Sequence, residues 1–299
     1  MAVSEHSKGV TVLGMGLMGS PLAVKVAEAG YDVTIWNRTI EKSQVVQQEN
    51  ARIAIAPTAS VAITASPIIL TLLSDYAALQ STLLSNDSKA ALKGKTVNQN
   101  GTNATKEAKE IAQAITQAGG NYLEAPVLGS IPQIKTGTLL VMVGGTPEQL
   151  DAQLPLLKTL GPEPQLVGPV GSAAALKLAL NQLIASLTSG FAASLGLVQQ
   201  AGIDLDIFMT ILRESALYAP TFDKKLQRMV DRNFANPNFP TKHLLKDTRL
   251  FAQAAEAYGV ETTIVQAIAQ VAAQAVDSGL QNDDYSAIYN TISPKSPGQ

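Results

Sequence analysis

The sequence contains no cysteine and only two histidines, His6 and His243. The absence of cysteine excludes disulfide bonds, thiolate zinc sites and a cysteine nucleophile. A histidine metal site or a Ser-His-Asp triad would need a well-placed histidine, but His6 lies in a polar first segment where we expect mobility, and His243 fits a surface or packing role. Asp283 and Asp284 have no matching set of acidic or histidine ligands, so we predict a helix start or loop there and no metal site.

Charged residues are also scarce, at 15% of the chain against about 25% in a typical soluble domain. The formal net charge of -2 gives no basic field for phosphate backbones, which argues against nucleic acid as the main partner. The 46% share of hydrophobic residues excludes disorder as a description of the whole chain. A small molecule is therefore the favoured ligand.

Long hydrophobic runs are missing as well. No stretch of about 20 uninterrupted apolar residues occurs, so we expect no membrane-spanning helix. The first residues, MAVSEHSK, lack the basic and apolar regions of a signal peptide. Together these absences predict a cytoplasmic protein.

The first part of the 299-residue chain alternates between strand-like and helix-like segments. Val10 to Leu13 is a short apolar run, a glycine-rich turn and the helical segment from Pro21 to Ala29 follow, and Tyr31 to Trp36 is β-branched and aromatic. The alternation continues with apolar runs at Ile68 to Leu73, Lys95 to Asn98, Tyr122 to Val127 and Leu139 to Val143. A helical segment, Thr105 to Ala118, lies between the second and third of these runs. This order predicts a doubly wound α/β domain of the Rossmann type, with a parallel sheet.

A segment dense in proline and glycine, from Gly161 to Gly171, predicts the boundary to a second domain. Beyond it, Ser172 to Gln200 forms one expected helix of roughly 29 residues, about 43 Å long. A helix this long, Ala-rich and sparsely charged is often buried on several sides, by its own domain or by a second subunit. We therefore expect a Rossmann-type domain over residues 1–170 and an all-α domain over 171–299, with a disordered tail at 293–299.

The glycine-rich turn matches the pattern GxGxxG, with the six residues Gly14, Met15, Gly16, Leu17, Met18 and Gly19. The three glycines suit a tight turn, close approach of a pyrophosphate, and close packing of helix on strand. The pattern follows a predicted strand and opens a predicted helix, which is the context that a dinucleotide site requires. A purely structural glycine turn is the alternative.

The end of the second strand indicates which dinucleotide binds. An NAD site usually has a carboxylate there for the ribose hydroxyls, whereas this chain has Asn37, Arg38 and Thr39. A guanidinium can hold a 2′-phosphate, and no acid is present to repel it. The sequence therefore favours NADP, unless Arg38 is an ordinary surface arginine.

Lys177 lies in an apolar helical segment and Asn181 follows it four residues later, on the same helix face. Such a pair suits a proton donor and the amide that positions it, although a lysine at a helix surface would give the same pattern. Two loops that follow strands are candidates for ligand contacts: Leu128, Gly129 and Ser130, with backbone amides free for an anion, and Asn100 to Thr102. Lys246 and Asp247 are a further candidate, or a solvated charge pair.

Taken together, these segments resemble the β-hydroxyacid dehydrogenase family, which includes 3-hydroxyisobutyrate dehydrogenases and glyoxylate/succinic semialdehyde reductases. The resemblance runs from about Val10 to Ala287. It rests on GMGLMGSPLA, WNRT, EAPVLGS, GSAAALKLALN, LLKD and DYSA, in that order.

The resemblance implies a Rossmann-type domain, an all-α domain built around the long interdomain helix, and homodimers or higher oligomers formed through the helical domains. It implies that Lys177 is the catalytic lysine, that Asn181 is its partner amide, and that Leu128, Gly129 and Ser130 hold the substrate carboxylate. It places Lys246 near the nicotinamide and the substrate, with Asp247 behind it. It extends the cofactor contacts to Leu73, Ser74 and Thr102.

Two departures bear on the substrate. Leu128 stands where the family usually has serine, and Asn100 to Thr102 stands where it usually has Ser-Thr-Ile. The segments WNRT, LSDY and NQNGT are similar to the related imine reductases, which share the fold and NADPH but generally lack the lysine.

The sequence thus predicts an NADPH-dependent oxidoreductase that reduces a small aldehyde or keto acid of the glyoxylate or succinic semialdehyde type. The first alternative is an imine reductase acting on cyclic imines. The second is a non-catalytic NADP-binding or chromatin-associated module, against which the Lys177 and Asn181 pair argues.

Overall fold

The computed structural model describes residues 9–294, so the predicted mobile segment around His6 lies outside the described residues. The chain divides into two compact units between Lys177 and Leu178, here called unit 1 and unit 2. The division falls inside the long helix, just after the proline- and glycine-rich segment where the sequence predicts a domain boundary.

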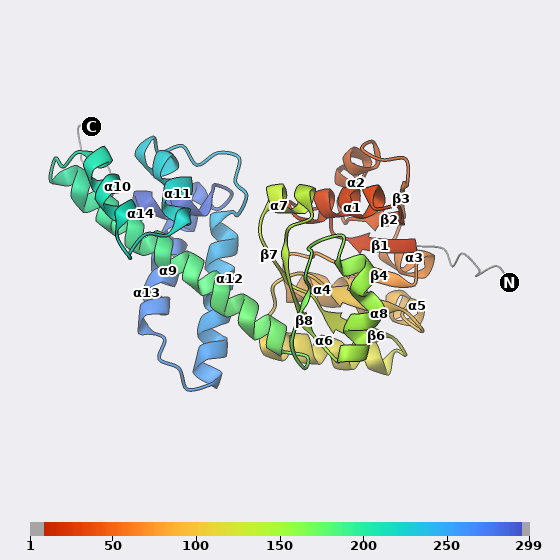
Figure 1. Ribbon diagram of the computed structural model, residues 1–299. Helices are drawn as coiled ribbons and strands as arrows, with labels where there is room; N and C mark the ends of the chain where they lie inside the picture. Colours follow the sequence, from red (N-terminus) through yellow and green to blue (C-terminus); the bar gives the residue numbers. More distant parts are fainter. Residues whose placement is uncertain (1–8, 295–299) are drawn as a thin grey trace. The chain divides into compact units, whose positions relative to one another are not determined.

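Unit 1 contains a nine-stranded sheet with the order β3-β2-β1-β4-β5-β6-β8-β7, and β9 pairs with β8. Figure 1 labels β1 to β4 and β6 to β8 of this sheet. The pairs from β3 to β6 are all parallel, while β8 runs antiparallel to β6 and β7. This arrangement confirms the predicted Rossmann-type domain. The strands are β1 (Gly9–Leu13), β2 (Asp32–Trp36), β3 (Ile53–Ile55), β4 (Ile68–Thr71), β5 (Thr96–Gln99), β6 (Asn121–Glu124), β7 (Val127–Leu128), β8 (Leu140–Gly144) and β9 (Gln165–Gly168).

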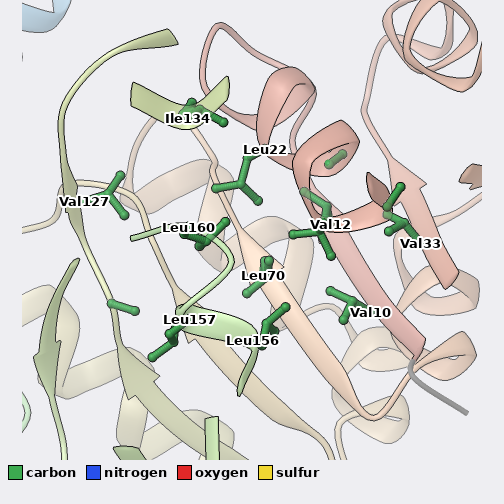
Figure 2. Packing of buried hydrophobic residues seen from close by; sticks show 14 of the residues in the cluster. Val10, Val12, Leu22, Val33, Leu70, Val127, Ile134, Leu156, Leu157 and Leu160 are labelled. Atoms are coloured by element: carbon green, nitrogen blue, oxygen red, sulfur yellow. The ribbon is translucent and has the colours of Figure 1, made fainter. Parts of the chain in front are cut away.

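Alternate residues of the central strands supply two cores, one on each face of the sheet. Val10, Val12 and Leu70 pack with Leu22 in the first core (Figure 2), whereas Leu13 belongs to the second. Each fully buried Val or Leu contributes roughly 1.5 to 3 kcal/mol relative to exposure. The helices of unit 1 are α1 (Gly19–Glu28), α2 (Ile40–Gln47), α3 (Ala59–Ala65), α4 (Tyr76–Leu83), α5 (Asn86–Ala91), α6 (Thr105–Gln117), α7 (Ile131–Thr136) and α8 (Pro147–Leu157).

The predicted strands occur where the sequence places them, with two differences. The run from Tyr122 to Val127 is two strands, because the chain breaks at Ala125 and Pro126, and proline has no N–H to donate to a ladder. Two strands were not predicted from the sequence. β3 has only three residues, and β9 is too exposed to show an apolar run.

Unit 2 confirms the predicted all-α domain: its described residues contain helices and a single isolated bridge between Pro240 and Asp284. The long helix α9 (Ser172–Gln200) has the predicted bounds and supplies Ala185, Phe191 and Leu195 to the two cores of this unit. The other elements are α10 (Leu205–Glu214), α11 (Pro220–Val230), α12 (Thr241–Ala257), α13 (Thr263–Ala275), η1 (Val276–Leu280), η2 (Tyr285–Ile288) and α14 (Tyr289–Ile292).

The helix α9 is long and apolar enough to cross a membrane, by length and composition alone. The core helix of a water-soluble protein passes the same test, so the expectation that no helix spans a membrane stays a prediction. Buried polar side chains such as Asn181 and Thr188 interrupt its apolar surface. Of the predicted disordered tail, Ser293 is held by Arg232, whose Nη2 donates to its carbonyl at 2.8 Å, and residues 295–299 lie outside the described part of the chain.

Candidate active site

The glycine-rich turn connects the carboxyl end of β1 to the first residue of α1. Gly14 has a φ of +104°, a conformation that disfavours other residues, and a Cβ on Gly19 would lie 1.8 Å from the Gly14 carbonyl oxygen. Gly16 is exposed, and a Cβ there would meet nothing within 4 Å. The first and third glycines are thus required by the protein's own packing, while the second leaves an open approach to the start of α1. A phosphate-bearing cofactor fits this arrangement, because the first N–H groups of a helix attract anions.

Asn37 ties the end of β2 to this turn. Its Oδ1 accepts from the Met15 N–H at 3.0 Å, and its Nδ2 donates to the Thr39 carbonyl at 2.8 Å. The sequence assigns Asn37 to cofactor binding, and the structure adds that its side chain orients the turn. Arg38 and Thr39 are exposed next to it. Because no carboxylate follows β2, a guanidinium is the charged group available there for a ribose phosphate.

The other predicted cofactor contacts follow β4 and β5 at the same edge of the sheet. Leu73 is half-buried against the second core, and Ser74 donates to Asp75 Oδ2 at 2.8 Å. Thr102 comes three residues after β5. Since the carboxyl ends of parallel strands share an edge, the structure brings these residues to the edge that carries the glycine turn.

The loop after β7 differs from the expectation that its backbone amides are free. Ser130 is the N-cap of α7, and both its N–H and its hydroxyl donate to Gln133 Oε1, at 3.0 and 2.7 Å. Leu128 is half-buried and Gly129 is exposed. An anion in this loop would therefore have to displace Gln133 from Ser130.

Lys177 and Asn181 are both on α9, four residues apart, as the sequence predicts. Asn181 is buried, and its Nδ2 donates to Asp247 Oδ2 of α12 at 2.7 Å. Asp247 is 4% exposed, so it is not part of a solvated charge pair, and its Oδ1 lies 3.1 Å from Lys246 Nζ. In unit 2, the structure thus connects three of the predicted residues: Asn181, Asp247 and Lys246.

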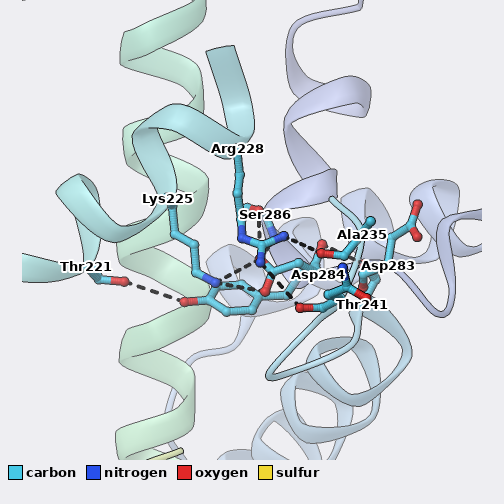
Figure 3. A network of polar contacts seen from close by, with 10 residues as sticks. Thr221, Lys225, Arg228, Ala235, Thr241, Asp283, Asp284 and Ser286 are labelled. Carbon is cyan, nitrogen blue, oxygen red and sulfur yellow. Dashed lines mark hydrogen bonds and ion pairs between the residues drawn. The ribbon is translucent and has the colours of Figure 1, made fainter. Parts of the chain in front are cut away.

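Of the two aspartates Asp283 and Asp284, Asp284 has a structural role. Asp284 is fully buried and N-caps η2, and both its oxygens lie 2.8 Å from Lys225 Nζ (Figure 3). Lys225 also lies over the Tyr285 ring. Over residues 9–294, no group of three or more His, Asp or Glu side chains could hold a metal ion. His243 stacks on Phe239, which agrees with a packing role.

Glu124 is a residue of interest that the sequence analysis did not single out. It is a carboxylate at the end of the buried strand β6, and burial raises its pKa to about 7. An acidic residue in the apolar run from Tyr122 to Val127 is the signal that could have identified it.

Comparisons with known proteins agree with the Rossmann-type fold and the helical region that follows it. Residues 9–168 match the family described as the NAD binding domain of 6-phosphogluconate dehydrogenase, and residues 171–292 match that described as NAD-binding of NADP-dependent 3-hydroxyisobutyrate dehydrogenase. The chain is 30% identical over 281 residues to glyoxylate/succinic semialdehyde reductase 2, chloroplastic, of Arabidopsis thaliana, covering 94% of this chain and 78% of that protein.

Two solved structures share the fold. The 3-hydroxyisobutyrate dehydrogenase from Salmonella typhimurium superposes with a TM-score of 0.84 at 23% identity, covering 94% of this chain and 99% of that chain. An imine reductase from Myxococcus stipitatus in complex with NADP+ superposes with a TM-score of 0.65 at 24% identity, covering 95% and 99% of the two chains.

Proposed function

Because the chain belongs to the β-hydroxyacid dehydrogenase family of NAD(P)-dependent oxidoreductases, we propose that it reduces a small aldehyde or keto acid to the hydroxyacid. Glyoxylate and succinic semialdehyde are the first substrates to test, because the plant relative is named for them. The observation that carries the proposal is the buried hydrogen bond from Asn181 to Asp247. It orients the side-chain amide of Asn181, which lies four residues after Lys177 on the same helix. We assign cofactor binding to residues 1–170 and substrate chemistry and assembly to 171–299.

NADP is the proposed cofactor. The support is the exposed guanidinium of Arg38 beside the glycine turn, in a loop without a carboxylate. The backbone from Gly14 to Gly19 and the loop residues Leu73, Ser74 and Thr102 would surround it. When bound, the nicotinamide supplies a hydride from C4 to the carbonyl carbon.

Lys177 is proposed to supply the proton. As an ammonium it protonates the oxygen that becomes negative when the carbonyl accepts a hydride, which makes it a general acid. Asn181, held by Asp247, would orient Lys177 and the substrate. In the reverse direction the same lysine, neutral, removes the proton of the hydroxyl group.

The substrate carboxylate is proposed to bind the loop of Leu128, Gly129 and Ser130. Lys246 of unit 2 is proposed separately as a substrate contact. Gln133 occupies the Ser130 amide, and Leu128 offers no hydroxyl. Of the groups that the sequence offers for the carboxylate, the Ser130 amide is engaged by Gln133, which leaves Gly129 and Lys246 as the proposed contacts.

A cyclic imine is the second candidate substrate. Its support is the fold shared with an imine reductase and the loop from Asn98 to Thr102, which is similar to that family. Lys177 favours the carbonyl, because an iminium ion arrives already protonated and accepts a hydride without a proton donor.

We further propose a homodimer, or a higher oligomer, located in the cytoplasm. The support for assembly is the row of exposed apolar side chains on α9 and α10 in unit 2, among them Leu197, Ile207 and Ile211.

The deciding experiment follows NADPH oxidation with glyoxylate, succinic semialdehyde and 1-pyrroline. Turnover of either carbonyl substrate in preference to the imine supports the proposal, and preference for 1-pyrroline favours the imine reductase. Tight NADPH binding with no turnover of any of the three would indicate the non-catalytic module.

A further inference from the structure

Glu124 connects the sheet of unit 1 to the start of the helix that carries Lys177. Its side chain is 2% exposed, and its Oε2 accepts from the Gly171 N–H at 2.7 Å. The N–H groups of Gly171, Ala173 and Ala174 all stabilise its ionised form. These are the orphan donors of the first turn of α9, so a carboxylate from β6 caps this helix.

The surroundings leave space for this carboxylate. Glu124 pairs with Gly144 of β8, and a Cβ on Gly144 would lie 2.1 Å from Glu124 Oε2. Any side chain at residue 144 would therefore push the carboxylate off the helix. Glu124 Oε1 is buried without a hydrogen-bond partner among the described residues. Glu124 also lines a cavity of about 10 Å³, the volume that holds roughly one water.

Few charges act on Glu124. Lys109 of α6 stabilises the ionised form of Glu124. The negative charge of Glu124 in turn helps to raise the pKa of Tyr122, which lies on the same strand. The other polar side chains of the cavity, Gln99 and Asn103, are neutral, and the residue of β8 that pairs with Glu124 is Gly144, which has no side chain. Burial nevertheless outweighs the N–H groups and Lys109, so both forms of Glu124 are populated near neutral pH.

We propose that Glu124 is a positioning residue: its ionised carboxylate holds the first turn of α9, and through that turn it places Lys177. This inference rests on the proposed role of Lys177. Charge-assisted hydrogen bonds are about twice as strong as neutral ones, so protonation of Glu124 loosens its hold on the turn. Lys177 is only about 9 Å along the helix from Gly171, at 1.5 Å per residue, so a shift of the first turn reaches it directly.

The test measures kcat and KM for an aldehyde with NADPH between about pH 5.5 and pH 9. In the wild type, kcat should rise roughly fivefold as Glu124 ionises, the effect of exchanging a neutral for a charge-assisted bond. Loss of the proton from Lys177 acts in the opposite direction, because it lowers the rate of carbonyl reduction as pH rises. The rise of kcat with Glu124 ionisation, here called the acidic limb, can therefore be told apart from the fall of kcat at higher pH.

Three variants isolate Glu124. Glu124→Gln keeps the size and one acceptor but cannot ionise, so its kcat should stay at the low-pH level and lose the acidic limb. Glu124→Asp keeps an ionisable group and should retain a limb. Glu107→Gln makes the same change at a glutamate that accepts a backbone N–H, that of Ala104, at the start of α6, and should behave as wild type. An acidic limb that persists in Glu124→Gln, or is lost in Glu124→Asp or Glu107→Gln, overturns the proposal.

Lys177→Ala separates this inference from the proposed function. In that background Glu124→Gln should lower kcat no further, and an additional loss would mean that Glu124 does not act through Lys177. If Lys177→Ala reduces aldehydes as fast as wild type, the proposed function itself fails. If it is slow while Glu124→Gln retains the wild-type pH profile, only the role of Glu124 fails.

Discussion

Asn181 of α9 donates to the carboxylate of Asp247 of α12 at 2.7 Å, and both side chains are buried, although the two residues are 66 positions apart in the sequence. A carboxylate accepts hydrogen bonds only, so it orients the Asn181 amide with its NH2 group toward α12. Asn181 Oδ1 is left buried and without a hydrogen-bond partner in the part of the chain that the structure describes. This oxygen is a ready acceptor for an ammonium or a substrate hydroxyl.

Asp247→Ala should therefore lower kcat by roughly 10- to 100-fold, the effect of losing a hydrogen bond to a charged group worth about 1.5 to 3 kcal/mol. The KM for NADPH should change little, because Asp247 contacts Asn181 and Lys246 and does not contact the glycine turn proposed to hold the phosphates. Steady-state kinetics with an aldehyde measure both. Asp231→Asn, at an exposed carboxylate of unit 2, is the control. Wild-type kcat in Asp247→Ala would show that the orientation of Asn181 is unimportant.

Arg38→Ala should weaken the binding of NADPH roughly 10- to 100-fold and the binding of NADH much less. The reason is that a charge-assisted contact to the 2′-phosphate, which NADH lacks, is worth about 1.5 to 3 kcal/mol. The dissociation constants of both cofactors, measured by fluorescence titration, give the comparison. Arg52→Ala removes an exposed arginine that pairs with Asp32 at 3.0 Å and should affect neither cofactor. Equal losses for NADPH and NADH would mean that Arg38 does not bind the 2′-phosphate.

The parts of this site that are local in sequence could be predicted from it. The turn from Gly14 to Gly19 depends on neighbouring residues, and the bounds of α9 follow from composition. The contacts that we propose to position the catalytic groups could not be predicted, because they join distant segments. Examples are Asp247 with Asn181 and Glu124 with Gly171. The hydrogen bond from the Ser130 N–H to Gln133 Oε1 joins residues close in sequence, but it depends on the rotamer of Gln133, which the sequence does not reveal.

Glu124 should also make stability depend on pH. Its pKa in the folded protein is about 7, above the ordinary 4.5, because burial makes ionisation costlier in the folded protein than in the unfolded chain. The stability that Glu124 contributes is therefore complete below about pH 4.5 and is lost as pH rises through 7. Between about pH 5 and about pH 8 the wild type should lose roughly 2 to 3 kcal/mol of unfolding free energy relative to Glu124→Gln. Urea unfolding of both proteins at the two pH values tests this. A constant difference would show that Glu124 does not titrate with a raised pKa.

The assembly should be at least a dimer in solution. Ile207 and Ile211, one turn apart on α10, are 58% and 65% exposed, and neighbouring exposed apolar side chains are typical of a protein interface. Light scattering at micromolar concentration should give a mass of at least twice 31.3 kDa. Ile211→Glu should lower that mass, whereas Val45→Glu, at an equally exposed residue of α2, should not. A stable wild-type monomer would contradict the prediction.

Lys177→Ala should cut aldehyde turnover by roughly 100- to 10,000-fold, the range for loss of a positioned general acid. NADPH binding should persist, because the glycine turn that receives the phosphates belongs to another segment of the chain, between β1 and α1. Lys224→Ala, at an exposed lysine of α11, is the matched control and should have wild-type kinetics.

The same variant distinguishes the two candidate substrates. A protonated imine needs no further proton to accept a hydride, so 1-pyrroline reduction should fall much less than aldehyde reduction in Lys177→Ala. Both substrates are measured with wild type and variant at one pH, beside an NADPH titration. If the variant binds NADPH and reduces aldehydes at the wild-type rate, Lys177 has a structural role. In that case the proposed mechanism is wrong.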